Sequence, residues 1–421
     1  MFQVVGNSWA LLLGVMLLMV GNGLQGTLLG VRGEIEGFST LAMSLVMSAY
    51  FVGFLFGSRV TPELIRRVGH VRVFAALASF VSAVLILYPT LASPWSWTIL
   101  RILIGFCFSG VYVTAESWLN NAATNDTRGQ TLSVYMIVQM VGIIIAQAIF
   151  ALGDPSSFVM FVIPSVLVSI SFAPILLSVS PTPAFERSKA MSLRKLYEVS
   201  PLGFVGIFMM GFVFASQLGM GAIYGTQAGM SLKQISLFIS AIYMGTVVLQ
   251  YPVGWLSDRM DRRLLVLVMS AAAGVVALAG FLFDGDYSVA LTVAFLIGGL
   301  ANPLYSLLLA YTNDFLEPDD MAAAASGMLF VNGVGAILGP IVSGFFMQIF
   351  GPGGFWLAVM IPLLLMAVYA AYRMTRRPAL AVSETAAYVA VMPSATAVAV
   401  EVAQEWAIEQ AEEDALAEES T

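Results

Sequence analysis

Two charged residues stand inside one apolar stretch, residues 97–118, and could do chemistry there. Arg101 is the more informative, because placing an arginine inside a membrane helix costs about 2.5–3.5 kcal/mol on insertion scales. Helical periodicity puts Arg101, Tyr112 and Glu116 on one stripe. The two charges are 15 residues apart, or roughly 22 Å at a rise of about 1.5 Å per residue. They cannot pair with each other, so each needs its own partner.

Each charge has competing interpretations. Arg101 faces a substrate or couples to protons in the outer half of a cavity, or it is a structural arginine that bonds backbone carbonyls or reaches the membrane interface. Glu116 pairs with a nearby arginine, carries a proton, or is a solvated acid in a surface pair worth about 0–1 kcal/mol. The arginines expected near Glu116 are Arg59, Arg66, Arg67 and Arg128.

Amide and phenol side chains recur inside the other apolar stretches. Polar groups in lipid must find partners, so these side chains should face the interior of a helix bundle. There they line a cavity and bind substrate, or they bridge neighbouring helices, and the sequence leaves both interpretations open. With Arg101, the cavity candidates are Asn22, Gln25, Tyr112, Gln139, Gln217, Tyr224, Asn302, Tyr305 and Asn332.

Other kinds of site lack their residues. The chain has one cysteine, Cys107, and one histidine, His70, which argues against a disulfide framework and a His/Cys metal site. The apolar stretches contain no nucleophile constellation, so we expect no enzyme. We also expect no cofactor and no nucleic-acid partner.

Membrane helices must position these side chains. Of 421 residues, 59% are hydrophobic and 10% are charged, and the mean hydropathy is +0.90, which indicates lipid as the solvent. About 20 apolar residues cross a bilayer as a helix. We predict twelve such helices, at 8–31, 41–60, 71–91, 97–118, 131–152, 158–179, 201–224, 235–256, 264–283, 288–311, 322–350 and 355–372.

The basic residues predict the orientation. With both termini in the cytoplasm, fifteen of the 18 Lys and Arg residues lie in cytoplasmic segments, and only Arg32 and Lys233 lie in outer loops. Cytoplasmic loops carry the excess of Lys and Arg in membrane proteins. We therefore expect a multi-pass protein of the plasma (inner) membrane with both termini cytoplasmic.

The chain also repeats itself. Moving the first half by 192 or 193 residues aligns polar residues and glycines across several helices, in a nearly constant register. The aligned pairs include Gln25 with Gln217, Gly53 with Gly245, Gly105 with Gly298, Tyr112 with Tyr305, and Gly142 with Gly335. Two halves in parallel register, with a cavity between them, are typical of transporters. We predict a six-helix bundle at 1–179, a linker at 180–200, a second bundle at 201–377 and a tail at 378–421.

Motifs at the helix ends carry a family resemblance. Residues 254–263 read G-W-L-S-D-R-M-D-R-R, which resembles the signature loop of the major facilitator superfamily (MFS). The counterpart at 62–70 is degenerate, because Pro62 replaces the glycine and Arg66 replaces the aspartate. Arg101-x-x-x-Gly105 is similar to the membrane-embedded arginine motif of the family. Residues 116–120, E-S-W-L-N, with the later Arg128-Gly129, resemble its YcaD-like bacterial branch.

The resemblance implies a fold and an activity. The fold is an all-α membrane protein with twelve transmembrane helices in two pseudo-symmetric six-helix bundles. The activity is secondary active transport of a small-molecule substrate by alternating access, and coupling to protons stays open. The helices lack an Asp or Glu at mid-depth, which favours a neutral, zwitterionic or anionic substrate attracted by Arg101. We expect a monomer in the lipid bilayer.

The resemblance also suggests a gate. Asp258 should face the N-terminus of a neighbouring helix, whose positive dipole end stabilises a carboxylate, while the adjacent arginines are gate elements or positive-inside anchors. Glu116 should replace the carboxylate that the degenerate loop lacks. The gating candidates are Glu116, Arg66, Arg67, Arg128, Asp258, Arg259, Arg262 and Arg263.

The tail differs from the rest of the chain. From Pro378 onward there are nine acidic residues and no basic ones, so the remaining body carries a net charge of +2. We expect a solvated cytoplasmic tail, helical near 398–419, rather than an element that binds a partner. The alternative function is a transporter-like membrane sensor or scaffold that signals through this tail. Deleting 378–421 separates the two, because a transporter should keep its flux.

Overall fold

A computed structural model describes residues 2–122, 125–177, 191–378, 380, 385, 388–404 and 406. The described residues form α-helices and no strand. The helices are α1 (Phe2–Ile35), α2 (Thr40–Val68), α3 (His70–Thr90), α4 (Pro94–Ala122), α5 (Asn125–Leu152), α6 (Val159–Ser171), α7 (Ala173–Leu177), α8 (Leu193–Val199), α9 (Pro201–Gln227), α10 (Leu232–Ser257), α11 (Arg262–Leu282), α12 (Tyr287–Ala301), α13 (Pro303–Asn313), α14 (Pro318–Phe350) and α15 (Gly354–Met374).

The predicted all-α membrane fold is confirmed. Within the described residues, twelve spans are long and apolar enough to cross a membrane, and each overlaps one predicted range. Two of the twelve are interrupted. One divides into α6 and α7, and the other divides into α12 and α13 at Asn302, before Pro303. Proline lacks the N–H of a continuous helix and clashes with the preceding turn, which explains the second interruption.

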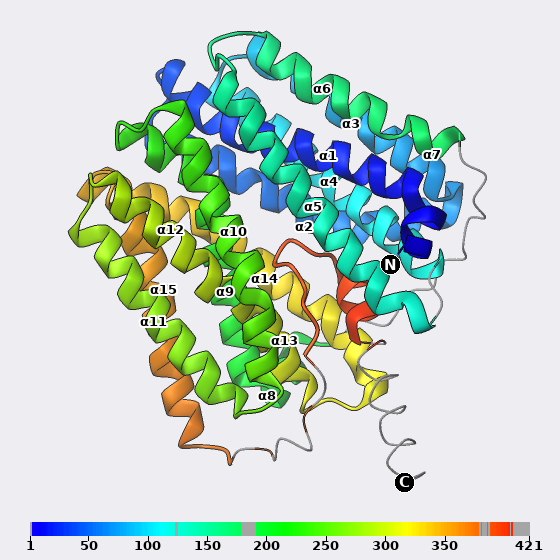
Figure 1. The fold of residues 1–421 in the computed structure, drawn as a ribbon, viewed down its shortest axis with the longest axis vertical. Coiled ribbons are helices and arrows are strands. Elements are labelled where there is room, and N and C mark those ends of the chain that lie inside the picture. The colour runs from blue at the N-terminus through cyan, green and yellow to red at the C-terminus, as the bar shows by residue number, and fades with distance from the viewer. Residues whose placement is uncertain are drawn as a thin grey trace.

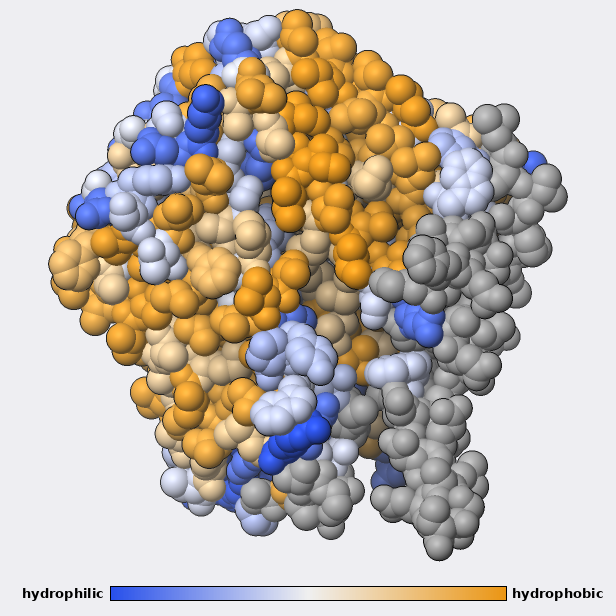
Figure 2. Space-filling view, viewed as in Figure 1, coloured by the Kyte–Doolittle hydropathy of each residue, from blue (hydrophilic) through white to orange (hydrophobic). Residues whose placement is uncertain are grey.

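Figure 1 shows the helices in two groups, α1–α7 and α9–α15, that lie side by side. Helix α1 begins and α15 ends at one end of the molecule, which we call the terminal end. The opposite end, which we call the distal end, carries the turns at 36–39, 91–93 and 228–231. Figure 2 shows apolar side chains over a broad part of the visible face, with polar ones gathered at its upper left and in its lower part. A broad apolar surface is expected where the protein contacts lipid.

Glycines set the closest helix contacts within the first group. A methyl group built on Gly53 of α2 would lie 1.9 Å from the carbonyl oxygen of Ile102 in α4, and one on Gly105 would lie 1.9 Å from the carbonyl oxygen of Tyr50. Small residues let helix backbones approach this closely in membranes. The two glycines therefore fix the position of α4, which carries both Arg101 and Glu116.

The second group repeats these contacts at the positions that the internal repeat aligns. A methyl group on Gly245 of α10 would lie 1.9 Å from the carbonyl oxygen of Phe295, and one on Gly298 would lie 2.0 Å from that of Ile242. The predicted pseudo-symmetry between the two six-helix groups is thus present in the helix contacts as well as in the sequence.

The two groups touch directly toward the distal end. A methyl group on Gly30 of α1 would lie 2.9 Å from the Cβ of Ala222 in α9. Gln227 Nε2 at the end of α9 donates a hydrogen bond of 2.7 Å to Thr40 Oγ1 at the start of α2. These contacts join the two groups directly at this end.

The described part of the linker packs on the second group. The N–H of Met191 donates to the carbonyl oxygen of Ala323 at 2.9 Å, and Lys195 Nζ in α8 lies 2.8 Å from Asp320 Oδ2. Leu196 is buried. The predicted linker residues 180–190 lie outside the described residues.

The prediction of a solvated tail is wrong for residues 388–404. Val391, Thr396 and Val400 are at most 5% exposed, and residues 397–404 are helical. Figure 1 shows this segment, in red, between the two groups at the terminal end. Ten of its 17 residues are Ala or Val and one is charged, so burial from water is favourable. Averaging over the whole acidic tail conceals this apolar segment. The predicted helix beyond 406 lies outside the described residues.

Candidate functional site

A cavity lies between the two helix groups near the middle of the molecule. Helices α1, α2, α4 and α5 line it on one side and α9, α10 and α14 on the other, with the tail residues Met392, Pro393 and Ser394 along part of its wall. About 990 Å³ is free of protein atoms, including the part open to solvent. Its lining is mostly apolar with a few convergent polar groups, which is typical of a small-molecule site.

Four predicted cavity residues form one hydrogen-bonded chain along this wall. Arg101 Nη1 donates to Gln25 Oε1 at 2.8 Å, and Gln25 Nε2 lies 3.4 Å from Asn22 Oδ1. Asn22 Nδ2 donates to Tyr112 Oη at 2.8 Å. All four side chains line the cavity. The chain joins α1 to α4 and orients the amides around the guanidinium.

The charge of Arg101 has little protein compensation. The residue is 5% exposed, and no ion pair between described residues includes it. Its other neighbours include Met47 Sδ, 3.3 Å from Nη2, the ring of Tyr50, whose centre is 5.1 Å from Cζ, and the hydroxyl of Tyr88, which interacts with the guanidinium. Its Nε has no hydrogen-bond partner among the described residues. A buried guanidinium of this kind is stabilised by an anion, because burial of an unpaired charge is costly.

Further predicted amides lie beside this chain. Gln139 and Asn332 line the same cavity, and Asn332 Nδ2 donates to the carbonyl oxygen of Pro393 at 3.0 Å. Gln217 and Asn302 line an adjoining cavity that also reaches Asn22. Both polar atoms of the buried Gln217 amide lack a hydrogen-bond partner among the described residues. That amide is therefore free to donate to a solute and to accept from it.

Two predicted cavity residues lie elsewhere. The ring of Tyr224 stacks on Phe355 with 5.0 Å between ring centres, and its hydroxyl donates to Asp284 Oδ1 at 3.2 Å. Tyr305 is fully buried and lines neither cavity. Tyr224 belongs to an aromatic cluster near the distal end, because its helical position turns it away from the space between the groups.

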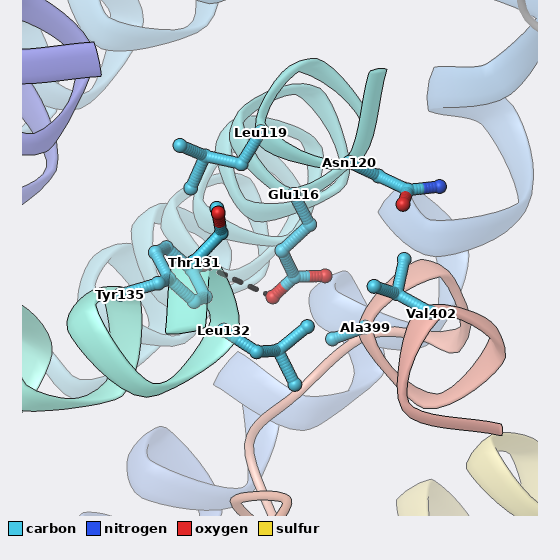
Figure 3. A pocket seen from close by; sticks show the side chains of 8 residues that line it. All are labelled: Glu116, Leu119, Asn120, Thr131, Leu132, Tyr135, Ala399 and Val402. Atoms are coloured by element: carbon cyan, nitrogen blue, oxygen red, sulfur yellow. Dashed lines mark hydrogen bonds between the residues drawn. The ribbon is translucent and has the colours of Figure 1, made fainter. Parts of the chain in front are cut away.

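Glu116 has partners that were not predicted. Its Oε1 accepts a hydrogen bond of 3.0 Å from Tyr135 Oη of α5, and its Oε2 accepts one from Thr396 Oγ1 of the tail. Figure 3 shows the carboxylate among Leu119, Leu132 and Val402. The residue is 5% exposed, so it is not a solvated acid at the end of a helix.

The predicted arginine partners of Glu116 are otherwise engaged. Arg66 and Arg67 both pair with Glu63, at 2.6 and 2.7 Å. Glu63 lies one helical turn before them in α2. Arg59 Cζ lies 4.7 Å from the centre of the Phe330 ring. None of these three arginines pairs with Glu116 in this structure, because Glu63 supplies the nearer carboxylate for Arg66 and Arg67. The gating role of Glu116 and the arginines stays a prediction. The side chain of Arg128 lies outside the described residues.

The loop after α10 contains a buried ion pair. Arg262 Nη1 lies 2.5 Å from Asp314 Oδ1, and both side chains are 2% exposed. Asp258 Oδ1 lies 3.5 Å from Arg262 Nη2 and accepts from the N–H of Tyr388 at 3.0 Å. We predicted that Asp258 faces the N-terminus of a neighbouring helix, but in this structure it bonds to Arg262 and to the tail instead. Arg262 is more than a positive-inside anchor, because it joins α11 to the end of α13.

The neighbouring arginines have local partners. Arg259 Nη1 donates to the carbonyl oxygen of Trp255 at 3.1 Å, within its own turn. Arg263 Nη2 lies 2.8 Å from Asp261 Oδ2. Burial alone would raise the pKa of Asp261, but the hydrogen bonds from Arg263 outweigh it and hold that pKa below its usual value. The pair is therefore ionised at neutral pH.

Sequence reasoning missed several residues at the cavity. Tyr50 and Tyr243 line it from α2 and α10, and Gln147 Nε2 donates to Thr27 Oγ1 at 3.0 Å beside the adjoining cavity. Single tyrosines in apolar helices give little signal, because most of them fill space. Nothing in the sequence indicated that the tail residues Met392, Pro393 and Ser394 line the cavity.

A family model and individual relatives both match this chain to the same family. The sequence model of the Major Facilitator Superfamily matches residues 11–242 and 203–400. An uncharacterized MFS-type transporter of Enterobacter sp. (strain 638) is 27% identical over 342 residues, covering 80% of this chain and 88% of the relative. The uncharacterized MFS-type transporter YcaD of Escherichia fergusonii is 26% identical over 342 residues, with the same two coverages, 80% and 88%.

Solved structures share the fold at low sequence identity. The nucleoside transporter NupG superposes with a TM-score of 0.71 at 16% identity and covers 88% of this chain and 97% of its own. A bacterial homolog of the human lysosomal transporter Spinster, inward-facing and unoccupied, superposes with a TM-score of 0.67 at 12% identity and covers 95% and 97%. At these identities the likeness concerns the fold alone.

Proposed function

Because this chain belongs to the Major Facilitator Superfamily, we propose that it is a secondary active transporter that moves a small solute with a negatively charged group by alternating access. The observation that carries the proposal is the Arg101 guanidinium at the central cavity. It is buried, it is held by Gln25, and it forms no ion pair with a described residue. Arg101 is the substrate-binding cation in this proposal.

The surrounding amides support a solute with several hydrogen-bonding groups. Gln25 bonds to the guanidinium and Asn22 bonds to Gln25, and Gln217 offers both a donor and an acceptor from the opposite helix group. A site built for hydrogen bonds discriminates strongly against solutes that lack them, because its own buried groups are then left unpaired. A carboxylate or phosphate with a neutral polar part fits this arrangement better than a purely apolar anion.

Alternating access follows from the two helix groups. We assign residues 1–179 and 201–377 as the two bundles that rock, with 180–200 as their connection. The bundles touch directly at the distal end, through Gly30 with Ala222 and Thr40 with Gln227. Opening this end requires these contacts to separate and the terminal end to close around the solute.

We assign the terminal end to the cytoplasm and the protein to the inner membrane. The terminal end carries the basic residues of the helix ends, including Arg66, Arg259 and Arg376, which supports this orientation by the positive-inside rule. A reporter fused after Thr421 that is active only in the periplasm should stay inactive, and the same reporter inserted in the distal turn at 153–157 should be active. The reverse result would overturn the orientation.

A ligand screen tests the substrate class. Purified protein is heated with a panel in which each carboxylate or phosphate solute is matched by its neutral amide or ester. A solute at about 100 times its Kd should stabilise the folded state by about 2.7 kcal/mol. We expect acids to raise the melting temperature and their neutral analogues to leave it unchanged. Equal stabilisation by both members of the pairs would remove the role given to Arg101.

Flux measurements test coupling. The acid identified by the screen is followed into proteoliposomes with and without an imposed pH gradient. We expect the acid to accumulate inside against its gradient when protons flow inward with it, because the protons balance the negative charge that the acid carries inward. Equilibration without accumulation under every ion gradient would identify a uniporter instead of a secondary active transporter.

A further inference from the structure

We infer that the space between the bundles at the terminal end is a peptide-binding site, and that its ligand is the chain's own segment Tyr388–Gln404, which holds the bundles apart and closes the substrate cavity. Binding of this segment is inferred from its contacts with the two bundles, and inhibition by it rests on the proposed transport function. We call residues 388–404 the plug.

The plug binds the first bundle at Glu116. Thr396 Oγ1 donates to the carboxylate, which also accepts from Tyr135. Ala399 and Val402 of the plug cover the remaining apolar surface around the carboxylate (Figure 3). A buried carboxylate requires hydrogen-bond donors, and the plug supplies the Thr396 hydroxyl together with backbone groups of Thr396 and Ala399. Removal of the plug would expose this acid to water.

The plug binds the second bundle through its backbone. Ser306 Oγ donates to the carbonyl oxygen of Val391 at 2.8 Å and accepts from the N–H of the same residue at 2.9 Å. Asn332 donates to the carbonyl oxygen of Pro393. Recognition of backbone groups by fixed side chains is typical of the capture of an extended peptide.

The two ends of the plug are held as well. The N–H of Tyr388 donates to Asp258 at 3.0 Å, and the hydroxyl of Tyr388 accepts from Gln250 Nε2 at 2.9 Å. At the other end, Gln404 Nε2 donates to Asn313 Oδ1 at 2.9 Å. The plug is thus fixed along its whole length, and burial of its Ala and Val side chains adds a hydrophobic contribution.

The plug competes with the proposed substrate. Met392, Pro393 and Ser394 form part of the wall of the same cavity that Arg101 and Gln25 line. Asn332, a candidate substrate ligand, is occupied by Pro393. While the plug is bound, a solute has neither the full cavity nor the route to it from the terminal end.

The plug also opposes closure of the terminal end. It bonds to Glu116 in α4 and to Ser306 and Asn313 in α13, which belong to opposite bundles. The bundles cannot close on each other at this end while a helix lies between them. The same segment therefore blocks the cavity and holds one conformation of the transport cycle.

Cysteine protection tests the binding without any substrate. In a Cys107→Ala background, Ala399→Cys places a thiol where 4% of the residue is exposed, and Arg376→Cys places a control thiol at an exposed position of the same end. With a hydrophilic maleimide we expect labelling at 399 to be at least roughly tenfold slower than at 376, because only the minor undocked fraction reacts. Equal rates in folded protein would overturn the peptide site.

A peptide added in trans gives a second test. Protein truncated after Arg377 should bind a peptide of residues 388–404 that carries an N-terminal lysine tag for solubility. The same peptide with Val402→Asp should bind at least roughly tenfold more weakly, because the added carboxylate would lie beside Glu116. A scrambled peptide controls for apolar adsorption. If all three bind alike, the segment is not a specific ligand.

Flux then tests the inhibition. If the plug occupies about nine-tenths of the molecules, its removal should improve the apparent substrate affinity roughly tenfold. We expect this gain in protein truncated after Arg377 and in full-length Val402→Asp, and reversal by the wild-type peptide. Unchanged flux together with positive protection and peptide binding would overturn the inhibition only. Absence of any transported acid would instead contradict the proposed function, and the labelling result would stand unaffected.

Discussion

The two buried charges of α4 are held in opposite ways. Arg101 faces the central cavity, and its hydrogen-bond partner Gln25 comes from the neighbouring α1. Glu116 lies at the terminal end of the same helix, and its partner Thr396 is 280 residues away in the chain. One charge is surrounded by helices and has no ion-pair partner among the described residues, whereas the other is enclosed by a segment that is not a membrane helix.

This difference indicates that Arg101 belongs to a site for a soluble ligand, whereas Glu116 belongs to a site for a segment of the same chain. A buried cation without a protein counter-ion gains from an external anion. A buried carboxylate with two hydroxyl donors is already satisfied, and it gains nothing from a solute. We therefore expect substitutions at Arg101 to change solute binding and substitutions at Glu116 to change binding of the plug.

Arg101→Gln should have the largest effect. Truncating one partner of a buried hydrogen-bonded charge costs about 2–5 kcal/mol, so we expect the Kd for the acidic solute to rise roughly a hundredfold. Peptide binding to protein truncated after Arg377 should not change. Isothermal titration with the solute and with the peptide measures both quantities. A large loss of peptide affinity would show that the two sites are one.

Gly105→Ala should affect both sites together. Its new methyl group would lie 1.9 Å from the carbonyl oxygen of Tyr50, so α2 and α4 must separate. Overpacking of this kind costs about 1–3 kcal/mol, and we expect a lower melting temperature with weaker binding of both ligands. Gly26→Ala is the control for stability, because nothing lies within 4 Å of its added methyl group. Equal melting temperatures for the two variants would contradict the close contact.

Glu116→Gln should weaken the plug. The amide keeps one accepting oxygen and replaces the other with a donor, which cannot accept from the Thr396 hydroxyl. Hydrogen bonds to charged groups contribute about 1.5–3 kcal/mol, so we expect roughly a tenfold loss of peptide affinity. Glu63→Gln, an exposed acid paired with Arg66, is the matched control. Titration of the peptide into each truncated variant measures its Kd. Identical Kd values for Glu116→Gln and Glu63→Gln would falsify the assignment of Glu116 to the plug site.

Tyr135→Phe should have the smallest effect. It removes the hydroxyl that donates to Glu116 at 3.0 Å and leaves Thr396 in place. A hydrogen bond to a charged group is worth at least about 1.5 kcal/mol, but a ring of equal shape and a water molecule recover part of it. We expect roughly a fivefold loss of peptide affinity in the same titration, with no change in solute binding. If Tyr135→Phe lost more peptide affinity than Glu116→Gln, the expected order of the two effects would be wrong.

Most of the fold could be predicted from the sequence. Hydropathy is a property of each short segment in contact with lipid, and it located all twelve spans of the described residues. The internal repeat located the glycine contacts of α2 with α4 and of α10 with α12, because a close backbone approach tolerates no side chain. The break at Asn302 was not predicted, since a proline in a membrane helix does not always interrupt it.

The candidate site was predicted in part. Asn22, Gln25, Arg101 and Tyr112 lie together because intramembrane polar groups must find partners, and few other polar groups are available to them. Tyr224 had the same chemistry but found an aromatic cluster and Asp284 instead. The type of a residue shows that it needs a partner, whereas the packing of the helices decides which partner it meets.

The sequence by itself determined that this chain is a membrane protein with twelve spans and a lone arginine in the fourth. These properties depend only on each segment and on the solvent around it. Only the tertiary structure decided that Thr396 meets Glu116 and that residues 388–404 lie between the bundles. Contacts over 280 residues depend on how the bundles are arranged and on the space they leave. An apolar segment of the tail fills that space, although the acidic composition of the tail as a whole predicts solvation.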